Sequence, residues 1–143
     1  MKLITGFFCI ATVFLFSCSN NLSGTEVPAV LTTTLMATFP EATDVEWEKK
    51  LEDYEAEFDI NKVEYTALMN ASGEMIMYKH DVTEQEFPEV VRAVIHQKYN
   101  GMKLDDYEKL FLNGQSYFQV ELDGTGKVFS SDGQEQTQVT YWE

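Results

Sequence analysis

Acidic side chains crowd the stretch between residues 41 and 64, and their spacing gives them the clearest potential for chemistry in this chain. Ten carboxylates stand there against three lysines. Between Tyr54 and Ile60, apolar residues alternate with acidic residues, a pattern typical of a strand with one buried face. The carboxylates then gather on the other face, where they suit a basic protein, a cationic peptide or a divalent cation. The residues that we expect on this acidic face are Asp44, Glu46, Glu48, Glu55, Glu57, Asp59 and Glu64.

A simpler interpretation of the acidic face is that it only keeps the domain soluble, because a charged surface opposes aggregation. Between a docking surface and a solvating surface, the sequence favours the solvating one. The Asp-x-Asp-x-Asp-Gly loop of calcium-binding hands is absent. Carboxylates that alternate along a strand also converge less well on one ion than those of a loop. We therefore predict no metal site.

The sequence offers no evident catalytic residues. His80 and His96 are the two histidines, and they fall on different predicted elements, a strand and a helix. No spacing singles out two carboxylates as the pair that glycoside hydrolysis requires. The chain has no Gly-x-Ser-x-Gly, His-Glu-x-x-His or phosphate-binding loop. We predict a protein that is not an enzyme and that uses no cofactor.

The first 17 residues have the features of an export signal. Lys2 supplies a positive start, and an apolar run of 14 residues follows from Leu3 to Phe16. A membrane-spanning helix needs about 20 residues, so this run is typical of a signal peptide that is removed. Loss of Lys2 moves the net charge of the chain from −14 to −15. Nucleic acid is therefore not expected as a partner, because its binding relies on Lys and Arg.

The residues Leu-Phe-Ser-Cys at 15–18 resemble the lipobox of bacterial lipoproteins. The resemblance implies that the chain is cut before Cys18 and that lipid on Cys18 anchors the protein to a membrane. In the resembling proteins, a serine such as Ser19 after the anchor implies transport to an outer membrane, on its periplasmic side or at the cell surface. An ordinary signal peptide with an incidental cysteine is the alternative. Since Cys9 leaves with the signal, the mature domain would have no disulfide.

Beyond the signal we expect a lipidated cysteine with a short linker, residues 18–25, and then two similar halves, residues 26–82 and 83–143. The halves match at an offset of 60 residues, as the pair Gly73 and Gly133 illustrates. A sequence repeat of this length indicates a duplicated structural unit. We therefore predict a tandem repeat.

Each half is predicted to be one helix followed by an antiparallel meander. Apolar residues recur about every four positions from Val27 to Phe39 and again from Phe87 to Tyr99, which indicates one helix in each half. The fold class is α+β, with the helices packed on one face of the sheet. A 60-residue unit buries only about 60% of its surface, so we expect both halves to share one continuous sheet. A last strand is expected from Gln136 to Trp142.

Two motifs of the first half carry a resemblance to a known family. Phe-Pro-x-Ala-x-x-Val-x-Trp-Glu at 39–48 and Tyr-Glu-Ala-Glu-Phe at 54–58 resemble the PepSY-like proteins, which are described as similar to β-lactamase-inhibitor protein. The resemblance covers residues 26–143 and weakens in the second half, where Asp105 replaces the apolar Val45. It implies an exported α+β domain without a settled activity. A role in binding or inhibiting proteins rests on fold analogy.

Two functions remain open at this point. In the first, the open acidic face binds a basic protein or peptide outside the cytoplasm. In the second, the chain is a structural or envelope-accessory lipoprotein with no soluble ligand. Trp47, Tyr54 and Tyr65 fall on the inner side of their predicted strands, where they would line a peptide groove or, more commonly, belong to the core.

Overall fold

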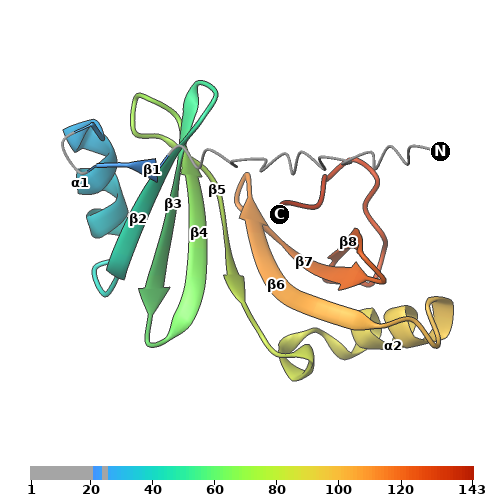
Figure 1. The fold of residues 1–143 in the computed structure, drawn as a ribbon. Helices are drawn as coiled ribbons and strands as arrows, with labels where there is room; N and C mark the ends of the chain where they lie inside the picture. The colour runs from blue at the N-terminus through green and yellow to red at the C-terminus, as the bar shows by residue number, and fades with distance from the viewer. Residues whose placement is uncertain (1–20, 24–25) are drawn as a thin grey trace, which may run out of the picture.

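The computed structural model describes residues 21–23 and 26–143, so the predicted signal peptide and Cys18 lie outside the described residues. A single antiparallel sheet of eight strands, in the order of the sequence, dominates the fold (Figure 1). Among the described residues, no helix has both the length and the apolar character needed to cross a membrane. The elements are β1 (Asn21–Leu22), α1 (Ala29–Thr38), β2 (Thr43–Lys50), β3 (Asp53–Ile60), β4 (Val63–Met69), β5 (Met75–Asp81), η1 (Glu84–Glu86), α2 (Glu89–Lys98), β6 (Leu104–Leu112), β7 (Gln115–Leu122) and β8 (Thr125–Ser130).

The first half of the chain has its own apolar core between α1 and the sheet. Pro28 precedes the first residue of α1, where a missing N–H costs no helical hydrogen bond. Leu31 and Leu35 lie one turn apart and are fully buried in one cluster with Trp47 and Phe58. The four-residue spacing of apolar side chains thus fixes which side of α1 meets the strands.

The second half of the chain also has an apolar core, which includes residues of α2. Val91 and Ile95 of α2 are buried in a cluster with Phe118 and Phe129 of the sheet. The turn η1 enters α2, and there the backbone N–H of Thr83 donates to a carboxylate oxygen of Glu86 at 2.7 Å. This is half of a capping box, which satisfies a donor that a short helical turn leaves free.

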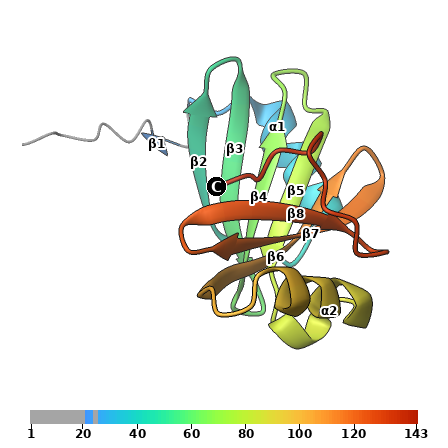
Figure 2. The same ribbon diagram turned by 90° about the vertical axis from the view of Figure 1, so that its right-hand side faces the viewer.

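β5 and β6 join the two halves into one sheet, as the sequence predicted. They pair in antiparallel register, with Tyr78 opposite Phe111. The rings of these two residues stack with centroids 4.5 Å apart, which adds side-chain contact to the backbone pairing at the seam. The sheet bends at this seam, so that β2–β4 and β6–β8 form two arms (Figures 1 and 2). We call the inner side of this bend the concave face.

The predicted last strand from Gln136 to Trp142 is wrong. The backbone N–H of Gln136 still donates to the carbonyl of Val128 at 2.8 Å, but no strand follows. The chain instead turns into the space between the two arms of the sheet (Figures 1 and 2). Its aromatic side chains find partners on the concave face, so alternation of polar and apolar residues did not lead to strand pairing.

Candidate functional site

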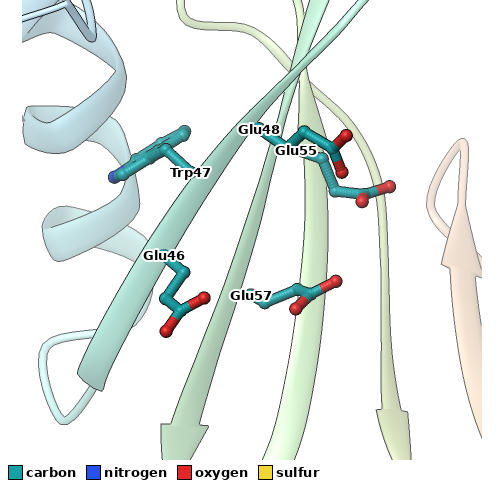
Figure 3. Close-up of a pocket in the computed structure, with 5 residues that line it drawn as sticks. All are labelled: Glu46, Trp47, Glu48, Glu55 and Glu57. Carbon is teal, nitrogen blue, oxygen red and sulfur yellow. The ribbon is translucent and has the colours of Figure 1, made fainter. Parts of the chain in front are cut away.

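The predicted acidic residues of β2 and β3 lie directly opposite one another in the sheet. Glu46 pairs with Glu57, and Glu48 pairs with Glu55. All four carboxylates point away from α1, whereas Trp47 between them points toward the helix (Figure 3). The period of two along a strand explains this division, because successive side chains leave the sheet on opposite faces.

The acidic face extends from β2 and β3 onto β4. Asp59 of β3 pairs with Glu64 of β4. Asp44 has a positive φ of 52° at an irregularity in the pairing of β2 with β3, and it lines one shallow hollow with Glu46 and Glu57. The structure therefore brings all seven predicted acidic residues together on one surface.

Among the described residues, ion pairs neutralise charge on the acidic face only at the end where Lys50 lies. Lys50 lies between Glu48 and Glu55, with its ammonium 2.7 Å and 3.2 Å from their respective carboxylates. The hydrogen bond to Glu48 is the main cause that raises the pKa of Lys50. In the part of the chain that the structure describes, Glu46 and Glu57 form no ion pair, so a negative centre remains between them.

The aromatic residues and histidines considered in the sequence lie outside the acidic face. Trp47, Tyr54 and Tyr65 pack in or against the core cluster under α1. His80 stacks on Tyr65 with ring centroids 4.8 Å apart, and the exposed His96 lies 2.6 Å from Glu84. Within residues 21–23 and 26–143, no three histidine, cysteine or acidic side chains are placed to hold a metal ion.

A second polar cluster on the concave face was not predicted from the sequence. Lys79 of β5, Glu108 of β6 and Gln119 of β7 are at least nine-tenths buried. The ammonium of Lys79 lies 2.8 Å from the carboxylate of Glu108, and the amide of Gln119 donates to that carboxylate at 2.5 Å. One signal in the sequence was the polar Gln119 between apolar Phe118 and Val120. We call these three residues the polar cradle.

Tyr141 and Trp142 cover the polar cradle. Lys79 donates to the backbone carbonyl of Trp142 at 2.9 Å. The ring of Tyr141 lies on Gly126 so closely that a Cβ at position 126 would overlap it. Burial, assisted by the nearby carboxylate of Glu108, raises the pKa of Tyr141 to about 12. Burial and nearby negative charge both disfavour the phenolate, so the raised pKa reflects the position of this side chain among acidic groups.

Several solved structures share this architecture, whereas neither a family model nor a curated protein matches the sequence. A BLIP-like protein from Bacteroides fragilis is 21% identical with a TM-score of 0.68, and the match covers 80% of this chain and 92% of that one. A DUF2874 family protein from Bacteroides uniformis is 21% identical with a TM-score of 0.70, covering 76% and 85%. A candidate periplasmic protein from Bacteroides eggerthii is 17% identical with a TM-score of 0.71, again covering 76% and 85%.

These likenesses establish the fold. At such identities they show a shared architecture and carry no function across. The chain has the BLIP-like α+β fold, a continuous antiparallel sheet with two helices, as the sequence resemblance predicted. The likeness to PepSY-like proteins stays a prediction.

Proposed function

We propose that this protein is a non-enzymatic binding module that captures a basic protein or peptide on its acidic face. The observation that carries the proposal is the direct pairing of Glu46 with Glu57 on neighbouring strands, where neither carboxylate forms an ion pair among the described residues. Like charges directly opposite one another destabilise a sheet. A basic partner would remove this repulsion, and complementary charge would speed its association.

A surface that serves only solubility would have a different charge pattern. Solubility is favoured by charges of both signs that are interspersed over the surface. On the acidic face, the charges are of one sign at Asp44, Glu46, Glu57, Asp59 and Glu64, which line one hollow. The role of an envelope-accessory protein with no soluble ligand is the alternative, and it predicts that reversing these charges affects solubility alone.

We further propose that the protein is exported and held by lipid on Cys18, on the periplasmic side of an outer membrane or at the cell surface. The lipobox-like residues 15–18 support the anchor, and the neighbour from Bacteroides eggerthii described as a candidate periplasmic protein supports export. The BLIP-like neighbour makes an inhibitor the form of binding to test first.

We also propose that the two halves are a tandem duplication with both helices on the convex side of the sheet. Gly73 lies under Val30 of α1, and Gly133 lies under Val90 of α2. Both glycines have a positive φ, 87° and 85° respectively. The pair of valine and glycine in the first half recurs 60 residues later in the second. Equivalent close contacts at equivalent positions support a common origin for the two halves.

A salt-dependent capture experiment tests the binding proposal. The domain from Ser19 onward is immobilised, and envelope extract and spent medium are passed over it at about 50 and about 500 mM salt. These concentrations lie below and above physiological ionic strength, where the Debye length is about 8 Å. We expect a basic partner that is retained at low salt and released at high salt. The Glu46→Lys/Glu57→Lys variant should lose this partner.

The control is Glu41→Lys/Glu89→Lys, which makes the same change in net charge at exposed positions off the acidic face. This control should retain the partner. Equal losses in both variants would reduce the effect to net charge. No salt-sensitive partner with the unaltered domain would favour the envelope-accessory role.

A further inference from the structure

The polar cradle recognises the main chain of a single residue. Lys79 and Gln119 both donate to the backbone carbonyl of Trp142, at 2.9 Å and 2.7 Å. The backbone N–H of Trp142 donates back to the side-chain oxygen of Gln119 at 3.3 Å. A primary amide offers one acceptor and two donors, so Gln119 bonds both main-chain groups of Trp142, as a neighbouring strand would. These contacts do not depend on which side chain the bound residue carries.

The cradle residues are buried, so these hydrogen bonds matter for their solvation. Gln119 is fully buried, and Glu108 and Lys79 are 7% and 8% exposed. Leu110 and Val128 share their face by register and are also buried, although neither belongs to the two clusters packed under the helices. The concave face of β5–β8 thus has buried polar and apolar side chains that need a segment to cover them.

Two aromatic side chains complete the contact. The ring of Tyr141 lies on the bare backbone of Gly126. The ammonium of Lys79 lies 5.5 Å from the centre of the Trp142 ring, within reach of a cation–π contact. An aromatic pair therefore accompanies the backbone contacts.

Residues 137–143, the cover segment, are bound to the sheet as a peptide ligand would be. They form no strand, and the preceding residue, Gln136, makes the last backbone hydrogen bond to β8. Within the described chain, the hydrogen bonds from the cover segment to the sheet all involve the main chain of Trp142. A segment held through so few groups can leave without disturbing the strands.

We propose that the concave face of β5–β8 is a binding site for an extended polypeptide segment with an aromatic pair, which a partner protein supplies by displacing the cover segment. The inference rests on the proposed function and adds a second subsite to it. A hollow lined by Lys50, Glu55 and Leu68 together with Tyr141 and Trp142 joins the acidic face to the cradle. A single partner can therefore place basic residues on the acidic face and its aromatic segment in the cradle.

The cover segment competes with any other segment for the site. The apparent affinity of a competing segment is therefore its intrinsic affinity multiplied by the fraction of molecules in which the site is open. The test uses a fluorescent peptide with the sequence of residues 136–143, and its binding is measured by anisotropy. We expect weak binding to the full domain and at least tenfold tighter binding to the full-length Tyr141→Ala/Trp142→Ala variant. A variant that lacks residues 137–143 should match the double variant if it remains folded by circular dichroism.

Gly126 provides the matched control on the protein side. Adding Gly126→Ala to the double variant should weaken peptide binding at least tenfold, because the methyl group takes the place of the Tyr141 ring. Adding the neighbouring exposed Thr125→Ala should leave binding unchanged. A second peptide, with serine at every position except the Tyr-Trp pair, should bind within threefold of the first if backbone and aromatic contacts suffice.

Three outcomes would overturn the inference. Equal binding by the full domain, the double variant and the variant that lacks residues 137–143 would make the cover segment an ordinary part of the fold. Loss of binding by the serine peptide would restrict the site to this chain's own segment. Dimerisation of the domain through exchanged cover segments, seen by sedimentation, would make a second copy the occupant. Since peptide binding should persist in about 500 mM salt and in Glu46→Lys/Glu57→Lys, its failure is distinguishable from failure of the acidic face.

Discussion

The Lys79–Glu108 pair shows how a buried charge depends on its partner. Both residues lie in the middle of the sheet, 2.8 Å apart, and the structure gives each a further hydrogen bond, to Trp142 and from Gln119 respectively. A buried ion pair contributes little net stability over apolar residues, but the loss of one member leaves an uncompensated charge. The polar cradle is therefore sensitive to single substitutions.

We predict that Glu108→Gln lowers the free energy of unfolding by about 3 kcal/mol, because it leaves the Lys79 ammonium buried without a counter-charge. Lys79→Met/Glu108→Gln should cost clearly less than the sum of the two single variants. Urea unfolding of the four proteins measures this coupling. Additive losses would mean that the two charges are solvated independently.

Glu135 ties α2 to the far edge of the sheet and provides a pH-dependent contact at the scale of elements. It accepts a hydrogen bond from Lys98, one from Tyr99 at 2.7 Å, and lies 3.0 Å from the ammonium of Lys127 on β8. The hydrogen bond from Lys98 is the largest of the effects that lower the pKa of Glu135, from 4.5 to about 2. A carboxylate whose pKa is lowered by folding stabilises the fold at pH values above its ordinary pKa. This stabilisation is lost as the pH falls toward the lowered pKa.

We therefore predict that the contribution of Glu135 is complete above pH 4.5 and disappears as the pH falls toward about 2. Glu135→Gln should lower the free energy of unfolding at pH 7 by about 1–2 kcal/mol, in line with hydrogen bonds to a charged group. Urea unfolding at several pH values between 7 and 2.5 should show the difference between the two proteins shrinking. A difference that stays constant would show that Glu135 is not the group titrating.

The close approach of α1 leaves no room for a side chain on the glycine at the turn between β4 and β5. Gly73 has a φ of 87°, and a Cβ there would lie 2.7 Å from a methyl carbon of Val30. Gly101 has a similar φ of 86° but has no atom near the position of a Cβ. A substitution at Gly101 would therefore cause backbone strain alone, whereas one at Gly73 would cause backbone strain and a steric clash.

Gly101→Ala should lower the free energy of unfolding by about 1 kcal/mol, the cost of a left-handed conformation with a Cβ. Gly73→Ala should cost about 1–3 kcal/mol more, because the added methyl group also overpacks the contact with α1. Thermal or urea unfolding of the two variants measures both losses in the free energy of unfolding. Similar losses at both positions would mean that α1 moves away freely.

Most of the elements were predictable because their patterns are local. The four-residue apolar spacing gave both helices, and the two-residue alternation around Glu55 and Glu57 gave the acidic face. The last strand was wrong because Tyr141 and Trp142 bind a surface rather than an edge, and no local pattern distinguishes these cases. The polar cradle was not predictable either, because its residues come from three strands, β5, β6 and β7, and no local pattern gives the register that places them side by side.

At the scale of the whole molecule, the proposed anchor determines where the domain works. Cys18→Ala should abolish acyl labelling and move the protein from the membrane fraction to the soluble fraction, because a lipid chain contributes about 0.8 kcal/mol for each buried methylene. Metabolic labelling with a fatty-acid probe and fractionation measure both effects. Continued labelling of the Cys18→Ala protein would rule out this residue as the anchor.

The short pairing of β1 with β2 would limit how far the domain stands from the proposed lipid on Cys18. Asn21, the first residue of β1, follows Cys18 by three residues, and an extended chain spans at most about 3.6 Å per residue. The outer edge of β2 would then be tethered within about 11 Å of the anchor, close to the range over which charges act at physiological salt. Anionic headgroups would repel the nearby carboxylates and tilt the acidic face outward, toward an arriving partner.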